Sequence, residues 1–169
     1  MKNAFTHFSI RFLAALLAGL FLLLLRSAMQ DPVCAVLTPR NAGPWELSKL
    51  VYWPLLLAMA LPLPGEGGIS ARLPWVTAAP VTAVLALWAL WALSALELGP
   101  GACAAVWVAL CAAALGLAQR GVLAKGDRSV WLVLAAAMGV LYVVFTLLPP
   151  MAGPFLDPAD AAAMAVIPY

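Results

Sequence analysis

The side chains best suited to recognise a ligand gather in one short segment between apolar runs. Arg40, Asn41, Glu46 and Lys49 fall within ten residues of each other, around Trp45. Ionisable groups beside lipid are costly unless they are paired or serve a site. We therefore take these five residues as a candidate site for a polar headgroup, a small solute or a partner subunit. The segment holds no nucleophile with an adjacent base, so no catalytic residue is assigned.

A well-formed helix start explains the same residues without a ligand. Gly43 can cap a helix whose first residue is Pro44, which places the Glu46 carboxylate at the third position, within reach of the cap N–H. Lys49 lies three residues further on, so it shares a helix face with Glu46 and can form an ion pair with it. The residue pattern favours this structural interpretation over the ligand site.

Other kinds of site find little support. The chain has one histidine and three cysteines without a CxxC pair, so no protein-only metal site is expected. Cys34 and Cys103 both fall on the expected outer side of a membrane, where a disulfide between them is allowed; Cys103 can equally be a small packing residue. The net charge of +2 is too small to indicate nucleic acid as a partner. No cofactor is expected, although bound lipid is compatible with this composition.

The amino-acid composition indicates which kind of fold must hold this polar segment in place. Of the 169 residues, 66% are hydrophobic and 9% are charged, whereas soluble domains carry roughly 25% charged residues. So few charges cannot cover the surface of a water-soluble monomer. The sequence therefore predicts a small all-α, polytopic membrane helix bundle whose solvent is the lipid bilayer.

Five apolar segments are long enough to cross a bilayer, and the whole chain, residues 1–169, is expected to form one membrane-embedded domain. Lys2 and Arg11 before the first segment also resemble the start of a cleaved signal, but no clear cleavage site follows, so we expect this helix to be retained. The expected helices cover residues 5–27, 45–63, 73–98, 102–118 and 129–148, with a polar connection at 28–44 and a tail at 149–169.

Basic residues predict the orientation, because connections rich in Lys and Arg stay on the cytoplasmic side. Three of the nine basic residues fall on the side of the membrane opposite the N-terminus, namely Arg26, Arg40 and Lys49. The other six share the side of the N-terminus, and they are Lys2, Arg11, Arg72, Arg120, Lys125 and Arg128. We therefore expect the N-terminus inside and the C-terminus outside, in the inner (plasma) membrane of a bacterium.

Small residues recur on the fourth expected helix. Such ridges let helix backbones approach closely in lipid, where the hydrophobic effect contributes little to helix pairing. We therefore expect two helix-packing faces, one formed by Gly101, Ala105, Ala109 and Ala113 and the other by Ala112 and Gly116.

The polar segment resembles the signature of a family of small, uncharacterised bacterial integral membrane proteins. The shared pattern, P-x-N-x-x-x-W-E-x-x-K, runs from Pro39 to Lys49 between the first two expected helices, and Pro54 follows it. Leu47 stands where the family has a histidine after the Trp–Glu pair, and Met151 stands where another histidine follows a double proline. Any metal or proton-transfer role of those histidines is therefore absent from this chain.

The chain end, residues 145–158, is also similar to the close of that family, and the two blocks together cover about a fifth of the sequence. The resemblance implies the topology and singles out the polar segment, but it implies no activity.

Sparse charge within the spans and the small-residue ridges favour packing over transport. We therefore expect a non-catalytic accessory, assembly or interaction subunit, in contact with other membrane subunits or with a second copy. The alternative is a small-solute or lipid-binding protein or transporter component that uses the polar segment. Pro54 and Pro80 are the candidate helix breaks that a transporter would need. A membrane-embedded enzyme, with Glu46 or an aspartate of the tail as acid or base, is the third interpretation.

Overall fold

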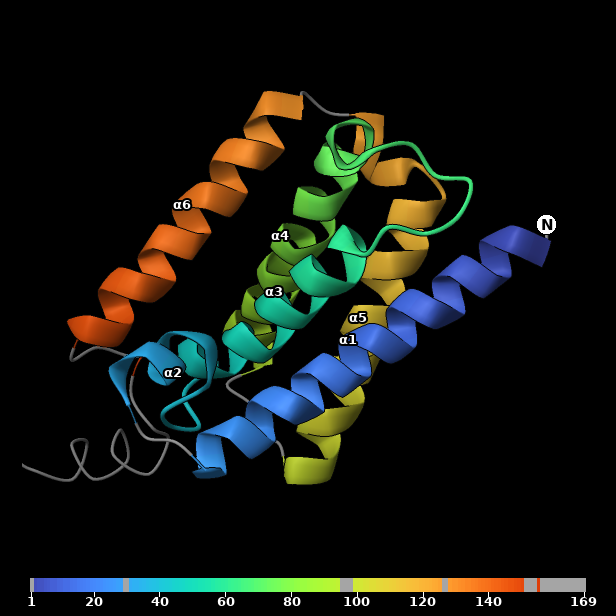
Figure 1. The fold of residues 1–169 in the computed structure, drawn as a ribbon. Helices are drawn as coiled ribbons and strands as arrows, with labels where there is room; N and C mark the ends of the chain where they lie inside the picture. Colours follow the sequence, from blue (N-terminus) through green and yellow to red (C-terminus); the bar gives the residue numbers. More distant parts are fainter. Residues whose placement is uncertain (1, 29–30, 95–98, 126–127, 151–154, 156–169) are drawn as a thin grey trace, which may run out of the picture.

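The computed structural model describes residues 2–28, 31–94, 99–125, 128–150 and 155, and within these ranges every regular element is a helix (Figure 1). The all-α prediction is confirmed for this part of the chain. Among the described residues, four helices are long and apolar enough to cross a membrane, at Ala4–Ala28, Ile69–Trp91, Gly101–Gln119 and Ser129–Leu147. The structure is thus consistent with a multi-pass membrane protein.

The helix bounds agree with the expected segments at most ends. Two short helices, α2 and η1, were not predicted, because they are too brief to show apolar periodicity. The second long helix ends at Ala60 rather than at residue 63, ahead of Pro62 and Pro64, and the third begins four residues early. Its expected end, residues 95–98, lies outside the described residues. The elements are α1 (Lys2–Ala28), α2 (Pro32–Leu37), α3 (Pro44–Ala60), α4 (Ile69–Ser94), α5 (Pro100–Gln119), the 3₁₀ helix η1 (Val122–Lys125) and α6 (Arg128–Leu147).

Helix α2 interrupts the segment that was expected to be an irregular connection. Asp31 caps it, because its Oδ1 accepts hydrogen bonds from the backbone N–H groups of Val33 and Cys34, each at 2.9 Å, and Pro32 occupies the first turn. These hydrogen bonds, that from Cys34 above all, hold the pKa of the Asp31 carboxyl below its usual value. The cap thus sets where α2 begins.

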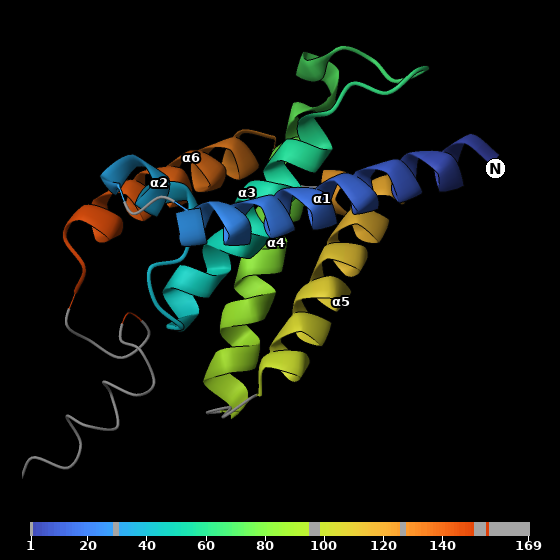
Figure 2. The same cartoon turned by 60° about the horizontal axis from the view of Figure 1, so that its bottom comes forward.

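Helix α3 lies at the centre of the bundle. It packs against α4, α1 and α5, while α6 packs against α4 and has α2 beside its C-terminal end (Figures 1 and 2). The core side chains of α3 include Val51, Leu55 and Ala58, all nearly inaccessible. The helix that carries the predicted polar segment is therefore the most enclosed element of the chain.

Connections that are distant in sequence meet at the two ends of the bundle. At one end, Arg11 of α1 reaches Glu66 in the α3–α4 connection. At the other, the turn before α3 contacts both α1 and α6, because Arg26 donates to the Arg40 carbonyl and Arg40 donates to the Thr146 carbonyl. Each end thus has its own charged cluster.

The small-residue ridge of α5 faces away from the other described helices of this chain. Gly101, Ala105, Ala109 and Ala113 are exposed, while Ala112 and Gly116 are half-buried. A Cβ atom added at Gly101 or Gly116 would meet nothing within 4 Å. The buried face consists of Cys111, Ala114, Leu115 and Ala118. Within the chain, these ridges are therefore not the packing faces of α5.

Close approach between α1 and α5 depends instead on Gly19. A Cβ atom there would overlap the Trp107 indole, lying 2.8 Å from its Cη2 atom. The indole cannot easily move away, because its Nε1 donates a 2.7 Å hydrogen bond to the Leu50 carbonyl on α3. The contact between α1 and α5 is therefore formed by the bulky Trp107 indole, which packs onto Gly19, rather than by two ridges of small residues.

Candidate functional site

The polar residues around the start of α3, Arg40, Asn41, Glu46 and Lys49, form a group that we call the outer cluster, after the membrane side predicted for it from the sequence. Its centre is a buried ion pair. Lys49 is fully buried, and its Nζ lies 2.7 and 2.9 Å from the two carboxylate oxygens of Glu46, which confirms the predicted pairing. The same ammonium donates to the Ala35 carbonyl at 2.9 Å and to Thr146 Oγ1 at 2.8 Å. An ammonium has three protons to donate. Acceptors from α2, α3 and α6 therefore already engage all of them.

The start of α3 differs in one detail from the expected capping arrangement. Gly43 is the cap and Pro44 the first helical residue, as predicted. However, the Gly43 N–H donates to Asn41 Oδ1 at 2.9 Å, while Glu46 Oε2 accepts from the Arg40 N–H at 2.7 Å. The Glu46 carboxylate therefore accepts a hydrogen bond from the turn before the helix, because the N–H of the cap residue Gly43 is already bonded to Asn41.

Arg40 and Asn41 connect the same turn to α6 and to residue 155. Arg40 is exposed, yet its Nη1 donates to the Thr146 carbonyl at 2.9 Å. Asn41 Nδ2 donates to the Phe155 carbonyl at 3.2 Å. The structure thus brings four predicted polar residues together and joins them to α2, α6 and residue 155.

Hydroxyl groups that the sequence did not single out as a set extend this network between α3 and α6. Ser48 Oγ and Tyr142 Oη lie 2.7 Å apart, and Tyr52 Oη donates to the Ala135 carbonyl at 2.8 Å. Thr146 Oγ1 donates to the Tyr142 carbonyl, one helical turn earlier in α6. The sequence contains one sign of this network, because each of the two apolar helices carries a pair of hydroxyl side chains four residues apart: Ser48 and Tyr52 on α3, and Tyr142 and Thr146 on α6.

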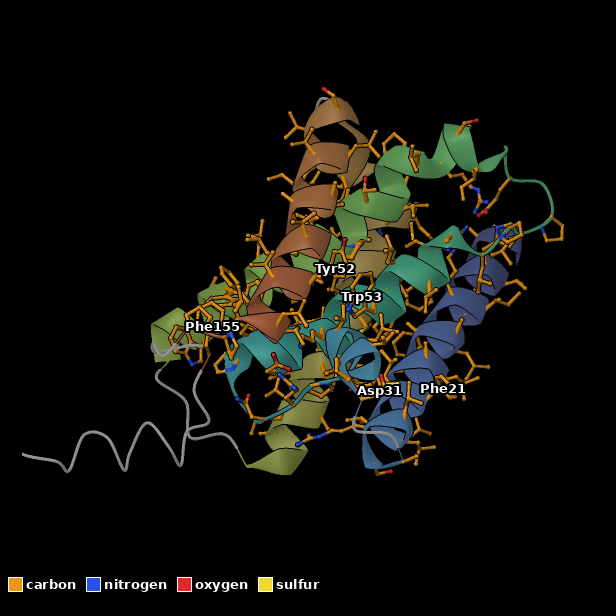
Figure 3. All side chains as sticks on the ribbon, turned by 60° about the vertical axis from the view of Figure 1, so that its left-hand side comes forward. Phe21, Asp31, Tyr52, Trp53 and Phe155 are labelled. Carbon is orange, nitrogen blue, oxygen red and sulfur yellow. The ribbon has the colours of Figure 1, made fainter. Side chains whose placement is uncertain are left out.

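Trp45 lies in the core of the bundle. It is 7% exposed, and its ring packs against four others, Trp88, Tyr142, Phe145 and Phe155, at centroid distances of 4.9–5.8 Å. Phe155 lies beside the start of α3 and the end of α6 (Figure 3). The Trp45 indole Nε1 is buried with no hydrogen-bond partner among the described residues. Trp45 therefore packs together aromatic rings from α4, α6 and residue 155.

A second charged cluster lies at the opposite end of the bundle and was not predicted. Glu66 forms ion pairs with Arg11 and, at 3.4 Å, with Arg72, and its Oε1 lies 3.3 Å from His7 Nδ1. These side chains line a cavity of about 370 Å³ between α1, α4, the α3–α4 connection and the end of α5. The one indication of this cluster in the sequence was the expected topology, which placed Arg11 and Arg72 on the same side of the membrane.

The remaining candidates are cysteines and metal ligands. The structure records Cys34 and Cys103 as thiols, so the disulfide that the sequence allowed is not formed in it. The neighbouring Asp31 carboxylate raises the pKa of the Cys34 thiol. Within the described ranges, no group of three or more His, Cys, Asp or Glu residues could hold a metal ion.

Comparison with known proteins adds no relative: no family model, no curated protein and no solved structure matches this chain. Fold and site together define the class as an all-helical protein with several potential membrane spans, in which the polar residues of the outer cluster bind one another.

Proposed function

We propose that this chain is a non-catalytic accessory or assembly subunit of a membrane complex. The observation that supports this proposal most strongly is the saturation of Lys49, whose ammonium is shared among Glu46, Ala35 and Thr146. A catalytic or ligand-binding ammonium needs a proton or a charge that is not already committed. Here the paired groups hold α2, α3 and α6 together.

The proposed topology has five crossings, with the N-terminus inside and the C-terminus outside. Helix α3 has 17 residues and at 1.5 Å per residue extends about 25 Å, close to the roughly 27–30 Å of a hydrocarbon core. It connects the two ends of the bundle beside α4, so it supplies the fifth crossing. Membership of the resembled bacterial family and a place in the inner membrane are parts of the same proposal.

The exposed ridge of α5 is the face that we assign to a partner subunit or a second copy. Gly101, Ala105, Ala109 and Ala113 are exposed small residues that none of the described helices covers. Small residues on a lipid-facing helix permit close contact with another helix. The rest of the outer surface carries large apolar side chains, such as Val133 of α6, which is 66% exposed and suits lipid.

The rival functions use the outer cluster as a ligand site, a transport site or an acid–base pair. They are less favoured, because Arg40, Asn41, Glu46 and Lys49 each hydrogen-bond to other parts of the chain. A ligand there would have to displace bonds that connect three helices, at a cost to folding.

Photo-crosslinking in native membranes tests the accessory role. A photoreactive amino acid at Ala109 is expected to give an adduct of one defined mass with a protein that also co-purifies stoichiometrically after gentle extraction. The matched position, Val133 on α6, is expected to give lipid adducts. Lipid adducts at both positions, together with a monodisperse lone monomer after extraction, would refute the proposal.

A further inference from the structure

We propose that the cavity at the α3–α4 end of the bundle binds a phosphate-type anion, carried by a lipid headgroup or free in solution. The cavity has a volume of about 370 Å³, enough for a phosphate group with part of its ester substituent. Two guanidinium groups, Arg11 and Arg72, line it together with Glu66 and His7. This site lies at the opposite end of the bundle from the outer cluster, so it does not depend on the accessory role.

Arg11 supplies the observation that points to a missing ligand. The residue is 5% exposed, and its Nη2 binds Glu66, yet its Nε–H is buried with no partner among the described residues. A buried donor left without an acceptor costs more than an exposed one, and more still when it is charged. An anionic oxygen in the cavity would provide the acceptor that Nε lacks.

The charges of the cavity favour an anion over a cation. Arg11 and Arg72 contribute two positive charges and Glu66 one negative charge, which leaves one net positive charge before any proton on His7 is counted. Arg72 is held in place, because its Nε donates to the Gly67 carbonyl at 3.0 Å and its Nη1 to the Leu61 carbonyl at 2.7 Å. Because Nε and Nη1 are engaged in these bonds, Nη2 is the nitrogen through which this fixed guanidinium would donate to a phosphate oxygen.

The surroundings suit a lipid as the source of the anion. Phe5 is 74% exposed and Ile69 is 56% exposed, and they lie one and two residues from Ala4 and Ala71, which line the cavity. Apolar side chains on the outside of the bundle can contact acyl chains while the headgroup occupies the cavity. Free phosphate would use the same guanidinium groups but none of these apolar contacts.

The test uses the full chain in neutral detergent, with binding measured by native mass spectrometry and by thermal shift. The probes are a short-chain phosphatidylglycerol and inorganic phosphate, each tested alone and in competition. We expect Arg11→Lys, which keeps the charge but lacks Nε, to weaken binding about tenfold, the loss of one charge-assisted hydrogen bond. Arg72→Gln, which leaves the Arg11–Glu66 pair intact, serves if Arg11→Lys fails to fold. Arg120→Gln is the control, because Arg120 is exposed and does not line the cavity.

Each outcome decides the proposal. Binding of phosphatidylglycerol that phosphate does not displace identifies the headgroup as the source, whereas binding of phosphate that displaces the lipid identifies the free anion. In both cases the cavity variants must bind more weakly than the control. Absence of binding by both probes, or equal binding by the cavity variants and Arg120→Gln, overturns the proposal.

Discussion

Replacing Lys49 with methionine is expected to destabilise the protein by about 3–5 kcal/mol, the usual cost of leaving one member of a buried ion pair without its partner. Methionine fills nearly the same volume, so packing changes little. Among the described residues, however, the buried Glu46 carboxylate would keep only the Arg40 N–H as a donor. Thr146 and the Ala35 carbonyl would also lose their shared donor.

A double-mutant cycle separates this effect from a ligand-binding role. Combining Lys49→Met with Glu46→Gln removes both charges and should recover part of the lost stability, measured by denaturant unfolding in micelles. Arg120→Met, which removes an exposed charge, should change stability by no more than about 0.5 kcal/mol. A Lys49→Met protein as stable as the original would contradict the structural role of this pair.

Truncating Trp45 to alanine is the second large change, with an expected loss of about 3–5 kcal/mol for a large buried aromatic side chain. The indole contacts rings on α4 and α6 as well as Phe155, so its removal would leave a cavity where three parts of the chain meet. Its Nε1 has no hydrogen-bond partner in the described structure. Trp45→Phe should therefore cost much less than Trp45→Ala.

Trp91 provides the comparison. Its ring contacts Trp88, and its side chain is only half-buried, so Trp91→Ala should be milder than Trp45→Ala in the same unfolding assay. Equal losses for Trp45→Phe and Trp45→Ala would show that the indole nitrogen, rather than ring packing, stabilises this region.

Local patterns in the sequence were sufficient for the all-α class, for the start of α3 at Gly43 and Pro44, and for the Glu46–Lys49 pair. These features depend on residues a few positions apart, whose relative placement the helix itself determines. The small-residue ridge of α5 shows the limit of such patterns. Periodicity tells which residues share a face, but the face that packs depends on the neighbouring helices, and here Trp107 fits onto Gly19.

The remaining partners could not be predicted, because they come from distant parts of the chain. Thr146 and the Ala35 carbonyl complete the Lys49 site from α6 and α2, and nothing in their local sequence signals that role. Glu66 lay in an expected turn, yet it pairs with Arg11, 55 residues away. A single sequence gives the side of the membrane on which charges fall, but not which of them meet.

The proposed topology requires α3 to cross the membrane, with the Glu46–Lys49 pair near its outer end. Single cysteines at Val33 in α2 and at Ser70 at the start of α4, both exposed, test this directly in a background without the natural cysteines. A membrane-impermeant maleimide applied to intact cells should label Val33→Cys, and it should label Ser70→Cys only after permeabilisation. Labelling of both cysteines from the same side would contradict the fifth crossing and the topology built on it.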